Sequence, residues 1–156
     1  RVVEAGYKYN LPDILAAIGR VQLRKAEGFL KRRRKIAAAY TRALAFRDYL
    51  ILPPSSAGSS WHLYIIRIRR DRLSISRDEY ISRLADAGIG TSVHYIPLHI
   101  MPYYRDRYAL RPEDFPVSWD AYQAAISLPI YPGLEDESVD RVIQAVIQIG
   151  DTALRH

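Results

Sequence analysis

Apolar residues recur at helical spacing over the first third of the chain, after the dipeptide Pro12-Asp13. Proline suits a first helical turn, and the aspartate suits the positive end of the helix dipole. We therefore predict one long helix from Asp13 to about Ala45, with a kink expected at Gly28. Its apolar positions are Ile14, Ile18, Ala26, Phe29, Ile36, Tyr40 and Leu44.

Two short runs predict strands. The first is WHLYIIRIR, residues 61–69, which is rich in aromatic and β-branched residues. Because side chains alternate along a strand, His62 and Tyr64 are expected to share one face, opposite Trp61. The second predicted strand runs from Thr91 to Ile96 and ends at Pro97.

Capping signals place the remaining helices. The sequence Ser76-Arg77-Asp78-Glu79 matches a capping box, and Gly88 is expected to end that helix. Short helices are predicted near residues 103–108 and 116–125, and an extended segment at 127–131. The acidic run 135–137 begins a last helix, whose apolar face is Val139, Val142, Ile143, Val146 and Ile149. Together these elements predict an α+β fold with a small, mainly antiparallel sheet covered by helices.

Composition narrows the class of protein. With 156 residues, of which 49% are hydrophobic, the chain can bury the core of one domain. It has no cysteine, which fits a reducing cytoplasm and excludes disulfides and thiolate sites. No apolar run is long enough to span a bilayer, and the basic, polar start is unlike a signal peptide. Since the chain begins without methionine, we expect it to be a piece of a longer protein.

The charge points to an anionic partner, because the formal net charge is +6. The run LKRRRK, residues 30–35, lies on the long predicted helix, whose other face is apolar. We interpret it as a solvated basic face in preference to a nucleic-acid-binding stripe.

The histidines are His62, His94, His99 and His156. The spacing of His94 and His99 across a proline is not that of a helical metal pair, so no metal site is expected. Motifs of serine hydrolases, dinucleotide-binding folds and phosphate loops do not occur. Taken alone, the residues offer polar loops suited to an anionic ligand and no complete catalytic set.

The order of several motifs is more specific. The series GYKYNLPDILAAIG, KRRRKIAAAY, SSWHLYIIRI, AGIGTSVHYIPLH, MPYYR and DFPVSWDAYQAAISLPIYPGL resembles the C-terminal portion of the DegT/DnrJ/EryC1/StrS family. The family consists of pyridoxal-phosphate-dependent aminotransferases that act on nucleotide-linked keto-sugars. The resemblance runs from Gly6 to about Ile149. It implies the small C-terminal domain of a type I aminotransferase fold, preceded by the helix that joins it to the large domain.

The resemblance also implies a division of the chain and of the chemistry. Residues 1–12 correspond to an active-site turn, 13–46 to the connecting helix and 47–156 to the small domain. The family's Schiff-base lysine lies upstream, and no lysine of this chain matches it. We therefore assign no catalytic residue here and expect the chain alone to be inactive. The lysines of the chain are Lys8, Lys25, Lys31 and Lys35.

In the family, the turn that matches Tyr7 to Asn10 reaches into the neighbouring subunit of a homodimer. Lys8 and Asn10 are accordingly predicted to bind the cofactor phosphate, and Tyr7 to lie at the substrate. Many relatives have asparagine at the position of Lys8 and arginine at that of Asn10. The version found here resembles enzymes that aminate UDP-linked 4-keto-sugars, with glutamate as the amino donor.

The segment VHYIPLH resembles a family loop beside the nucleotide-sugar cleft. His94, Tyr95 and His99 are thus candidate substrate contacts, together with His62. Relatives commonly have threonine at the position of Glu135, so a threonine N-cap is expected to be missing there.

Three alternatives remain open. The chain is a binding or regulatory domain without catalysis if it is complete as it stands. It is a nucleic-acid-binding domain if the basic helix binds duplex DNA. Within the family, it is part of a dehydratase if histidine replaces the upstream lysine.

Overall fold

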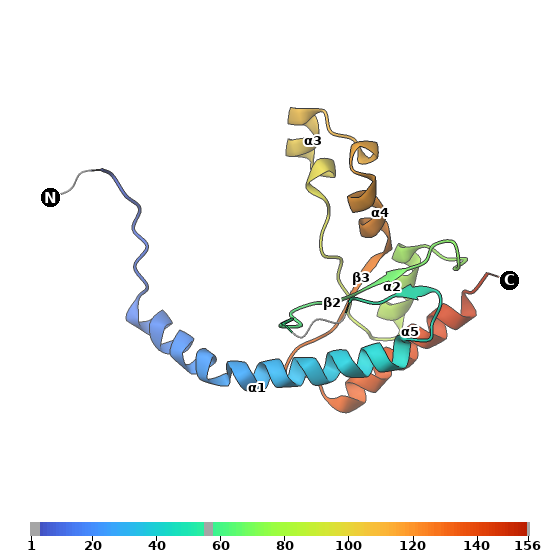
Figure 1. Cartoon of the computed structure of the whole chain (residues 1–156), viewed down its shortest axis with the longest axis horizontal. Coiled ribbons are helices and arrows are strands. Elements are labelled where there is room, and N and C mark those ends of the chain that lie inside the picture. The colour runs from blue at the N-terminus through green and yellow to red at the C-terminus, as the bar shows by residue number, and fades with distance from the viewer. Residues whose placement is uncertain (1–3, 55–57, 156) are drawn as a thin grey trace.

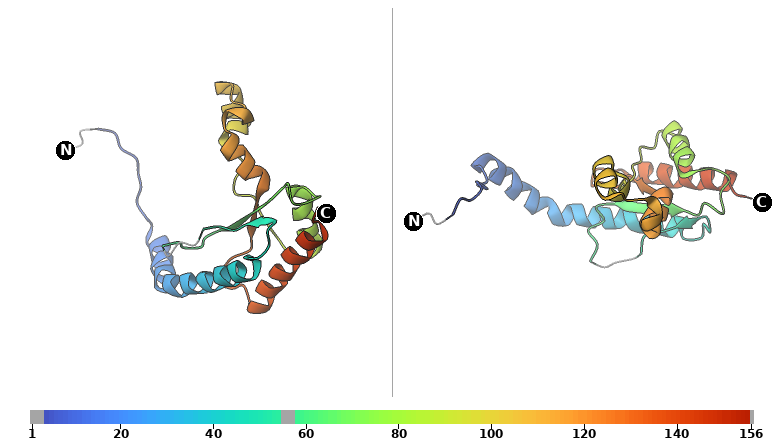
Figure 2. Two further views of the ribbon diagram at one scale, coloured as in Figure 1. Left: turned by 45° about the vertical axis from the view of Figure 1, so that its right-hand side comes forward. Right: turned by 90° about the horizontal axis from the view of Figure 1, so that it is seen from above.

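The computed structural model describes residues 4–54 and 58–155. The elements are α1 (Asp13–Leu44), β1 (Leu50–Ile51), β2 (Tyr64–Ile68), α2 (Arg77–Asp86), η1 (Leu98–Ile100), α3 (Pro102–Tyr108), η2 (Pro112–Asp114), α4 (Pro116–Ala124), β3 (Ala125–Leu128) and α5 (Asp136–Thr152). Helix α1 runs along one side of the body, and its first turns project beyond it with the preceding segment (Figures 1 and 2). Helices α3 and α4 form a second projection, which rises from the sheet (Figure 1).

The three strands form an antiparallel sheet in the order β1-β2-β3. Leu50 lies opposite Ile68 in the first pair, and Tyr64 lies opposite Leu128 in the second. The predicted α+β class with a small antiparallel sheet is therefore confirmed.

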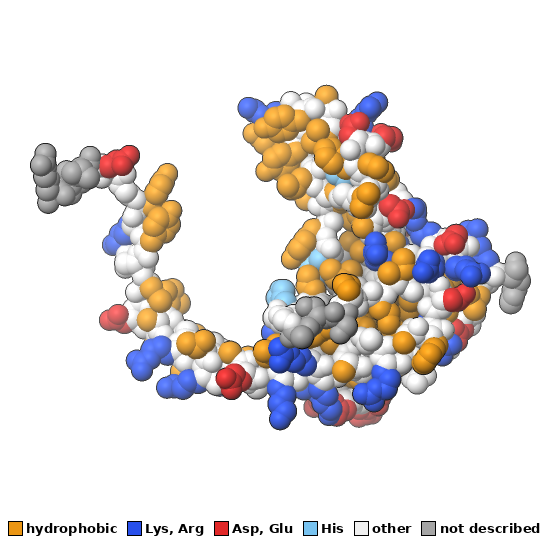
Figure 3. Space-filling view, in the orientation of Figure 1, with side chains coloured by type: hydrophobic (Ala, Val, Ile, Leu, Met, Phe, Trp, Pro, Cys, Tyr) orange, Lys and Arg blue, Asp and Glu red, His pale blue; other side chains and the backbone are white. Residues whose placement is uncertain are grey.

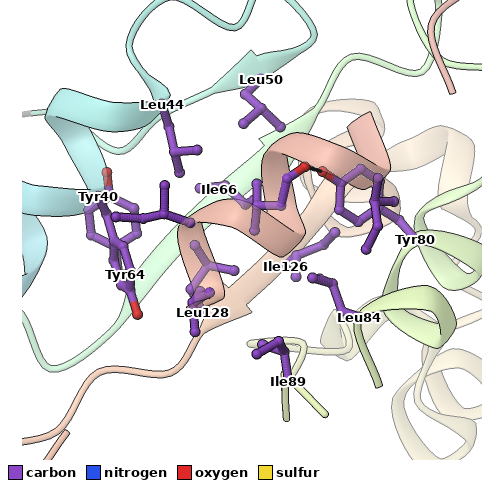
Figure 4. Packing of buried hydrophobic residues seen from close by; sticks show 14 of the residues in the cluster. Tyr40, Leu44, Leu50, Tyr64, Ile66, Tyr80, Leu84, Ile89, Ile126 and Leu128 are labelled. Carbon is purple, nitrogen blue, oxygen red and sulfur yellow. Dashed lines mark hydrogen bonds between the residues drawn. The ribbon is translucent and has the colours of Figure 1, made fainter. Parts of the chain in front are cut away.

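One face of the sheet carries the core. Tyr64, Ile66 and Ile68 alternate inward along β2 and are buried, and every residue of β3 is buried. Figure 4 shows Ile66, Ile126 and Leu128 in the middle of the core, with Tyr40 and Tyr64 at one end and Tyr80 and Leu84 at the other. Helices α1, α2 and α5 supply the covering side chains, so the opposite face of β2 is left to α4 and to the loops around it.

The close packing of α5 has a clear sequence cause. A Cβ atom added at Gly150 would lie 2.1 Å from Cε2 of Tyr49. The Tyr49 hydroxyl donates to the Asp151 carboxylate at 2.8 Å, which fixes the ring against the helix. Glycine is thus required here for contact with an aromatic ring.

The long predicted helix is confirmed, but its two halves differ. Ile36, Tyr40 and Leu44 are buried to 1% exposure or less. In contrast, Ile14 and Leu23 are each 76% exposed. We call residues 13–28 the outer half of α1, residues 29–44 its inner half, and the extended residues 4–12 before the helix the arm.

Part of the basic run serves the fold. Arg32 and Lys35 both pair with the Asp136 carboxylate at the start of α5, and Arg32 also donates to the carbonyl oxygen of Leu134. This clamp ties α1 to α5 and uses two charges of the run within the chain. Other basic side chains spread along the outer side of α1 (Figure 3).

The predicted helix boundaries are mostly confirmed. The Ser76 hydroxyl accepts from the Glu79 amide, although the Glu79 carboxylate pairs with Arg83 and not with the cap. Gly88 has φ +76° and ends α2 as expected. Glu135 precedes α5 without a side-chain capping hydrogen bond, in agreement with the missing threonine cap.

The predicted strand at 91–96 is wrong. Only Ser92 pairs, through an isolated antiparallel bridge to Ser127. Towards Gly90, which precedes the predicted strand, the ladder stops because Pro129, the residue after β3, has no N–H to donate.

The start of the first predicted strand is also wrong. Trp61 has φ 48°, outside the strand region, and β2 begins at Tyr64. Tyr64 is buried and its hydroxyl lies 2.8 Å from that of Thr41, whereas His62 is exposed. The expected pairing of His62 and Tyr64 on one face therefore does not occur.

Candidate functional site

Two candidate substrate residues meet at the edge of β3. His62 comes from the loop before β2, and His94 from the loop after α2. Both line a cavity of about 390 Å³, which we call the histidine cavity. Its other walls include Ser92, Ser127, Leu128 and Pro129.

His94 is held by the strand itself. Its Nδ1 lies 2.8 Å from Oγ of Ser127, in the middle of β3. The Ser127 backbone meanwhile exchanges hydrogen bonds with Ser92, at 2.8 and 3.3 Å. With Nδ1 occupied, Nε2 is the ring atom left for a ligand.

A second cavity lies on the face of the sheet that α1 and α5 do not cover. Its volume is about 610 Å³, and we call it the outer cavity. It is lined by Ile51, Pro53, Ile65, Arg67, Tyr95 and Tyr122, among others. His94 lines both cavities, so the two adjoin at this residue.

Tyr95 lies at the mouth of the outer cavity and is 70% exposed. The edge of its ring faces His94, with centroids 4.7 Å apart. Among the candidate residues, His62, His94 and Tyr95 are thus brought together. Figure 3 shows histidine side chains on the side of the body that faces the arm.

His99 is placed differently. It is 5% exposed and stacks on Phe115 at a centroid distance of 4.9 Å, with Trp119 at its edge. It lines neither cavity. Its position supports a packing role between η1 and α4, and substrate contact by His99 stays a prediction.

The arm residues lie apart from the cavities. Tyr7, Lys8 and Asn10 are exposed, and Tyr7 contacts Tyr9 at a centroid distance of 5.8 Å. An ammonium and an amide supply suitable donors for a phosphate, so their chemistry fits the group implied for them. Within this chain they do not meet the histidine cavity.

Two buried groups support the walls of the cavities. The Tyr40 hydroxyl donates to the carbonyl oxygen of Pro129 at 2.8 Å. Burial, reinforced by Tyr131 and Tyr64, raises the pKa of Tyr40 above its usual range, so the phenol stays a neutral donor.

On the other side, the Arg77 guanidinium lies 4.9 Å from the centre of the Tyr122 ring. It also donates to the carbonyl oxygen of Ala125 at 3.2 Å. Arg77 thereby fixes Tyr122 at the junction of α4 and β3, beside the outer cavity.

Sequence reasoning missed Ser127, Arg67 and Tyr122. Ser127 lies in a segment expected only to be extended, and its contact with His94 depends on a pairing distant in sequence. The alternation of β2 does contain a signal for Arg67, because it turns outward from a strand whose neighbouring positions are apolar.

Other kinds of site find no support in the described part of the chain. Residues 4–54 and 58–155 contain no group of three or more histidine, cysteine or acidic residues placed to hold a metal ion. Within the same ranges, no helix has both the length and the apolarity to cross a membrane. The lysines lie on the arm and on α1, and none lines either cavity.

The sequence model of the DegT/DnrJ/EryC1/StrS aminotransferase family matches residues 1–147. The chain is 45% identical over 150 residues to the uncharacterized protein MJ1066 of Methanocaldococcus jannaschii. It is 40% identical over 151 residues to the spore coat polysaccharide biosynthesis protein SpsC of Bacillus subtilis. Each match covers 95% of this chain.

Among solved structures, the PLP form of the putative sugar aminotransferase Spr1654 from Streptococcus pneumoniae is similar, with a TM-score of 0.87 and 31% identity. The match covers 99% of this chain and 40% of that one. The chain likewise spans 39% of the length of each of the two curated relatives. It is therefore comparable to a part of these proteins.

Proposed function

The chain belongs to the DegT/DnrJ/EryC1/StrS aminotransferase family, and on this premise we propose that it is the C-terminal part of a pyridoxal-phosphate-dependent sugar aminotransferase. The main support is the extent of the family match, which includes the arm residues Lys8 and Asn10 as well as the cavity residues His62 and His94. The proposed substrate is a nucleotide-linked keto-sugar, in particular a UDP-linked 4-keto-sugar, with glutamate as donor. A cytoplasmic location belongs to the same proposal.

Pyridoxal phosphate, when bound, supplies the electron sink for amino-group transfer. The residues of this chain bind and orient. Lys8 donates from its ammonium group, and Asn10 from its amide, to phosphate oxygens in the neighbouring subunit of a homodimer. His94, fixed through Nδ1 by Ser127, presents Nε2 to a sugar hydroxyl.

Exposed apolar side chains at the end of the arm and the start of α1 support the dimer. Leu11, Ile14 and Leu15 are 64%, 76% and 53% exposed. Such a surface needs a partner, and a second subunit would bring Lys8 and Asn10 to its own cofactor.

Turnover tests the proposal directly. The full-length protein that contains this chain, supplied with pyridoxal phosphate and glutamate, should convert a UDP-4-keto-sugar into the amino sugar, detected by mass spectrometry. If the product has lost water and gained no nitrogen, the protein is a dehydratase. If no sugar nucleotide reacts and duplex DNA binds with a steep salt dependence, the proposed function is wrong.

The role of the arm has its own test. Replacing Asn10 with alanine should weaken cofactor binding about tenfold, as expected for one lost hydrogen bond to a charged group. The measurement is the absorbance of the bound cofactor after dialysis. Gln22→Ala is the matched control, because it removes an exposed amide from α1. Equal retention by the two variants would remove Asn10 from the site.

A further inference from the structure

Arg67 is the basic residue at the floor of the outer cavity. It is exposed on the central strand β2, with Ile51 opposite it on β1 and Ala125 opposite it on β3. All three residues line the outer cavity. The sheet thus fixes the backbone of Arg67 at one wall of the outer cavity.

This guanidinium has no ion pair or hydrogen bond with residues 4–54 or 58–155. Like Arg67, Arg69 has no side-chain ion pair with the described residues, but it does not line the outer cavity. Three other arginines are paired: Arg70 bonds to Asp120 and Gln123, Arg72 pairs with Asp48, and Arg77 pairs with Asp78. Arg67 consequently keeps its donors for an anion, for which the planar fork of arginine is well shaped.

The rest of the outer cavity is apolar and aromatic. Ile51, Ile65 and Pro53 form one part of the wall, and the rings of Tyr95 and Tyr122 another. Because Arg77 lies over the Tyr122 ring, that ring is held in place beside the cavity. Aromatic and apolar walls around one cation suit a flat base attached to phosphate.

The histidine cavity has a different chemistry. Its polar side chains are hydroxyls and imidazoles, from Thr91, Ser92, Ser127, His62 and His94. These groups suit the hydroxyls of a sugar. Its volume, about 390 Å³, is also smaller than the 610 Å³ of the outer cavity.

We infer that a sugar nucleotide lies across both cavities, with its sugar in the histidine cavity, its diphosphate at Arg67 and its base against Tyr95 and Tyr122. His94, which lines both cavities, stands where the two parts of the ligand join. This inference rests on the proposed function, and it makes Arg67 a specificity-determining residue for the nucleotide.

The test compares Arg67→Gln with Arg69→Gln in the full-length enzyme. Both remove one exposed charge from neighbouring outward positions, and Arg69 does not line the outer cavity. The probes are UDP, uridine and inorganic pyrophosphate, titrated by calorimetry. Absorbance of the bound cofactor and reaction with glutamate alone serve as checks of folding.

Arg67→Gln should raise the dissociation constants of UDP and pyrophosphate about 10- to 100-fold, as for a lost hydrogen bond between charged groups. The dissociation constant of uridine should stay the same. The Arg69→Gln variant should bind all three probes as tightly as the unmodified enzyme does.

If Arg67→Gln binds UDP normally, or if both variants lose affinity equally, the inference is overturned. Turnover of sugar nucleotides by the unmodified enzyme would then still uphold the proposed function. An unmodified enzyme that neither binds UDP nor converts any sugar nucleotide would overturn both.

Discussion

The two halves of α1 show how one sequence pattern serves two environments. Tyr40 and Leu44 in the inner half are fully buried, whereas Ile14 and Leu23 in the outer half are mostly exposed. The apolar periodicity is continuous along the helix and predicts it as a single element. Periodicity therefore indicates that a face is apolar, and does not indicate which part of the chain covers it.

The difference has an energetic meaning. Helices in proteins are stabilised chiefly by packing of their apolar face. The apolar face of the inner half packs against β2 and α5, whereas the apolar face of the outer half has no comparable packing within the described chain. We expect the outer half to depend on the neighbouring subunit or on the rest of the full-length protein.

The largest expected effect is a cavity in the core. Leu44→Ala should lower the free energy of unfolding of the chain by about 2–5 kcal/mol, because it removes a fully buried side chain. Leu23→Ala, the same change in the outer half, should alter it by less than about 0.5 kcal/mol. Urea denaturation measures both. Similar losses in the two variants would show that the halves are equally packed.

Replacing glycine with alanine should destabilise the chain at Gly150 and favour the helix at Gly19. Gly150→Ala should destabilise the chain by about 1–3 kcal/mol, since the new Cβ would collide with the Tyr49 ring. At Gly19, in the outer half of α1, a Cβ would meet nothing within 4 Å. Alanine there should favour the helix by about 0.5–1 kcal/mol. Thermal unfolding followed by circular dichroism measures the first, and the change in helical content the second. Stabilisation by Gly150→Ala would contradict the packing described here.

The smallest effect concerns the clamp between α1 and α5. Hydrogen bonds from Lys35 and Arg32 lower the pKa of Asp136 below its usual 3.8. A carboxylate with a lowered pKa stabilises the folded state at neutral pH. This contribution falls away as the pH drops below about 3.8 and through the lower folded value.

Asp136→Asn should therefore cost a little stability at pH 7 and make unfolding less sensitive to acid, and added salt should reduce the difference. Denaturation at several pH values measures it. Asp140→Asn, which removes an exposed carboxylate from the same helix, is the control. An unchanged acid profile in Asp136→Asn would exclude a contribution from the clamp.

Local signals made much of the fold predictable. The helical spacing of Ile36, Tyr40 and Leu44, the cap at Ser76 and the glycine at position 88 each depend on a few neighbouring residues, and all three are confirmed. The same holds for α5, whose apolar face is evident from its periodicity.

The predictions that are wrong concern segments whose structure depends on contacts distant in sequence. The run 91–96 has strand composition, yet only Ser92 finds a partner, through an isolated bridge to Ser127 of β3. The candidate site likewise depends on contacts that the sequence pattern does not show. The sequence identifies His62 and His94 as candidates, whereas their common cavity results from the placement of β3.

Ser127 gives β3 a double role. Its backbone pairs with Ser92 and its side chain meets His94, while Ile126 and Leu128 on either side belong to the core. A slip of one residue in the pairing of β3 would turn Ser127 to the other face of the sheet. A substitution at Ile126 or Leu128 that shifted this register would therefore displace His94 as well. The anchor of His94 is thus part of the strand that builds the core.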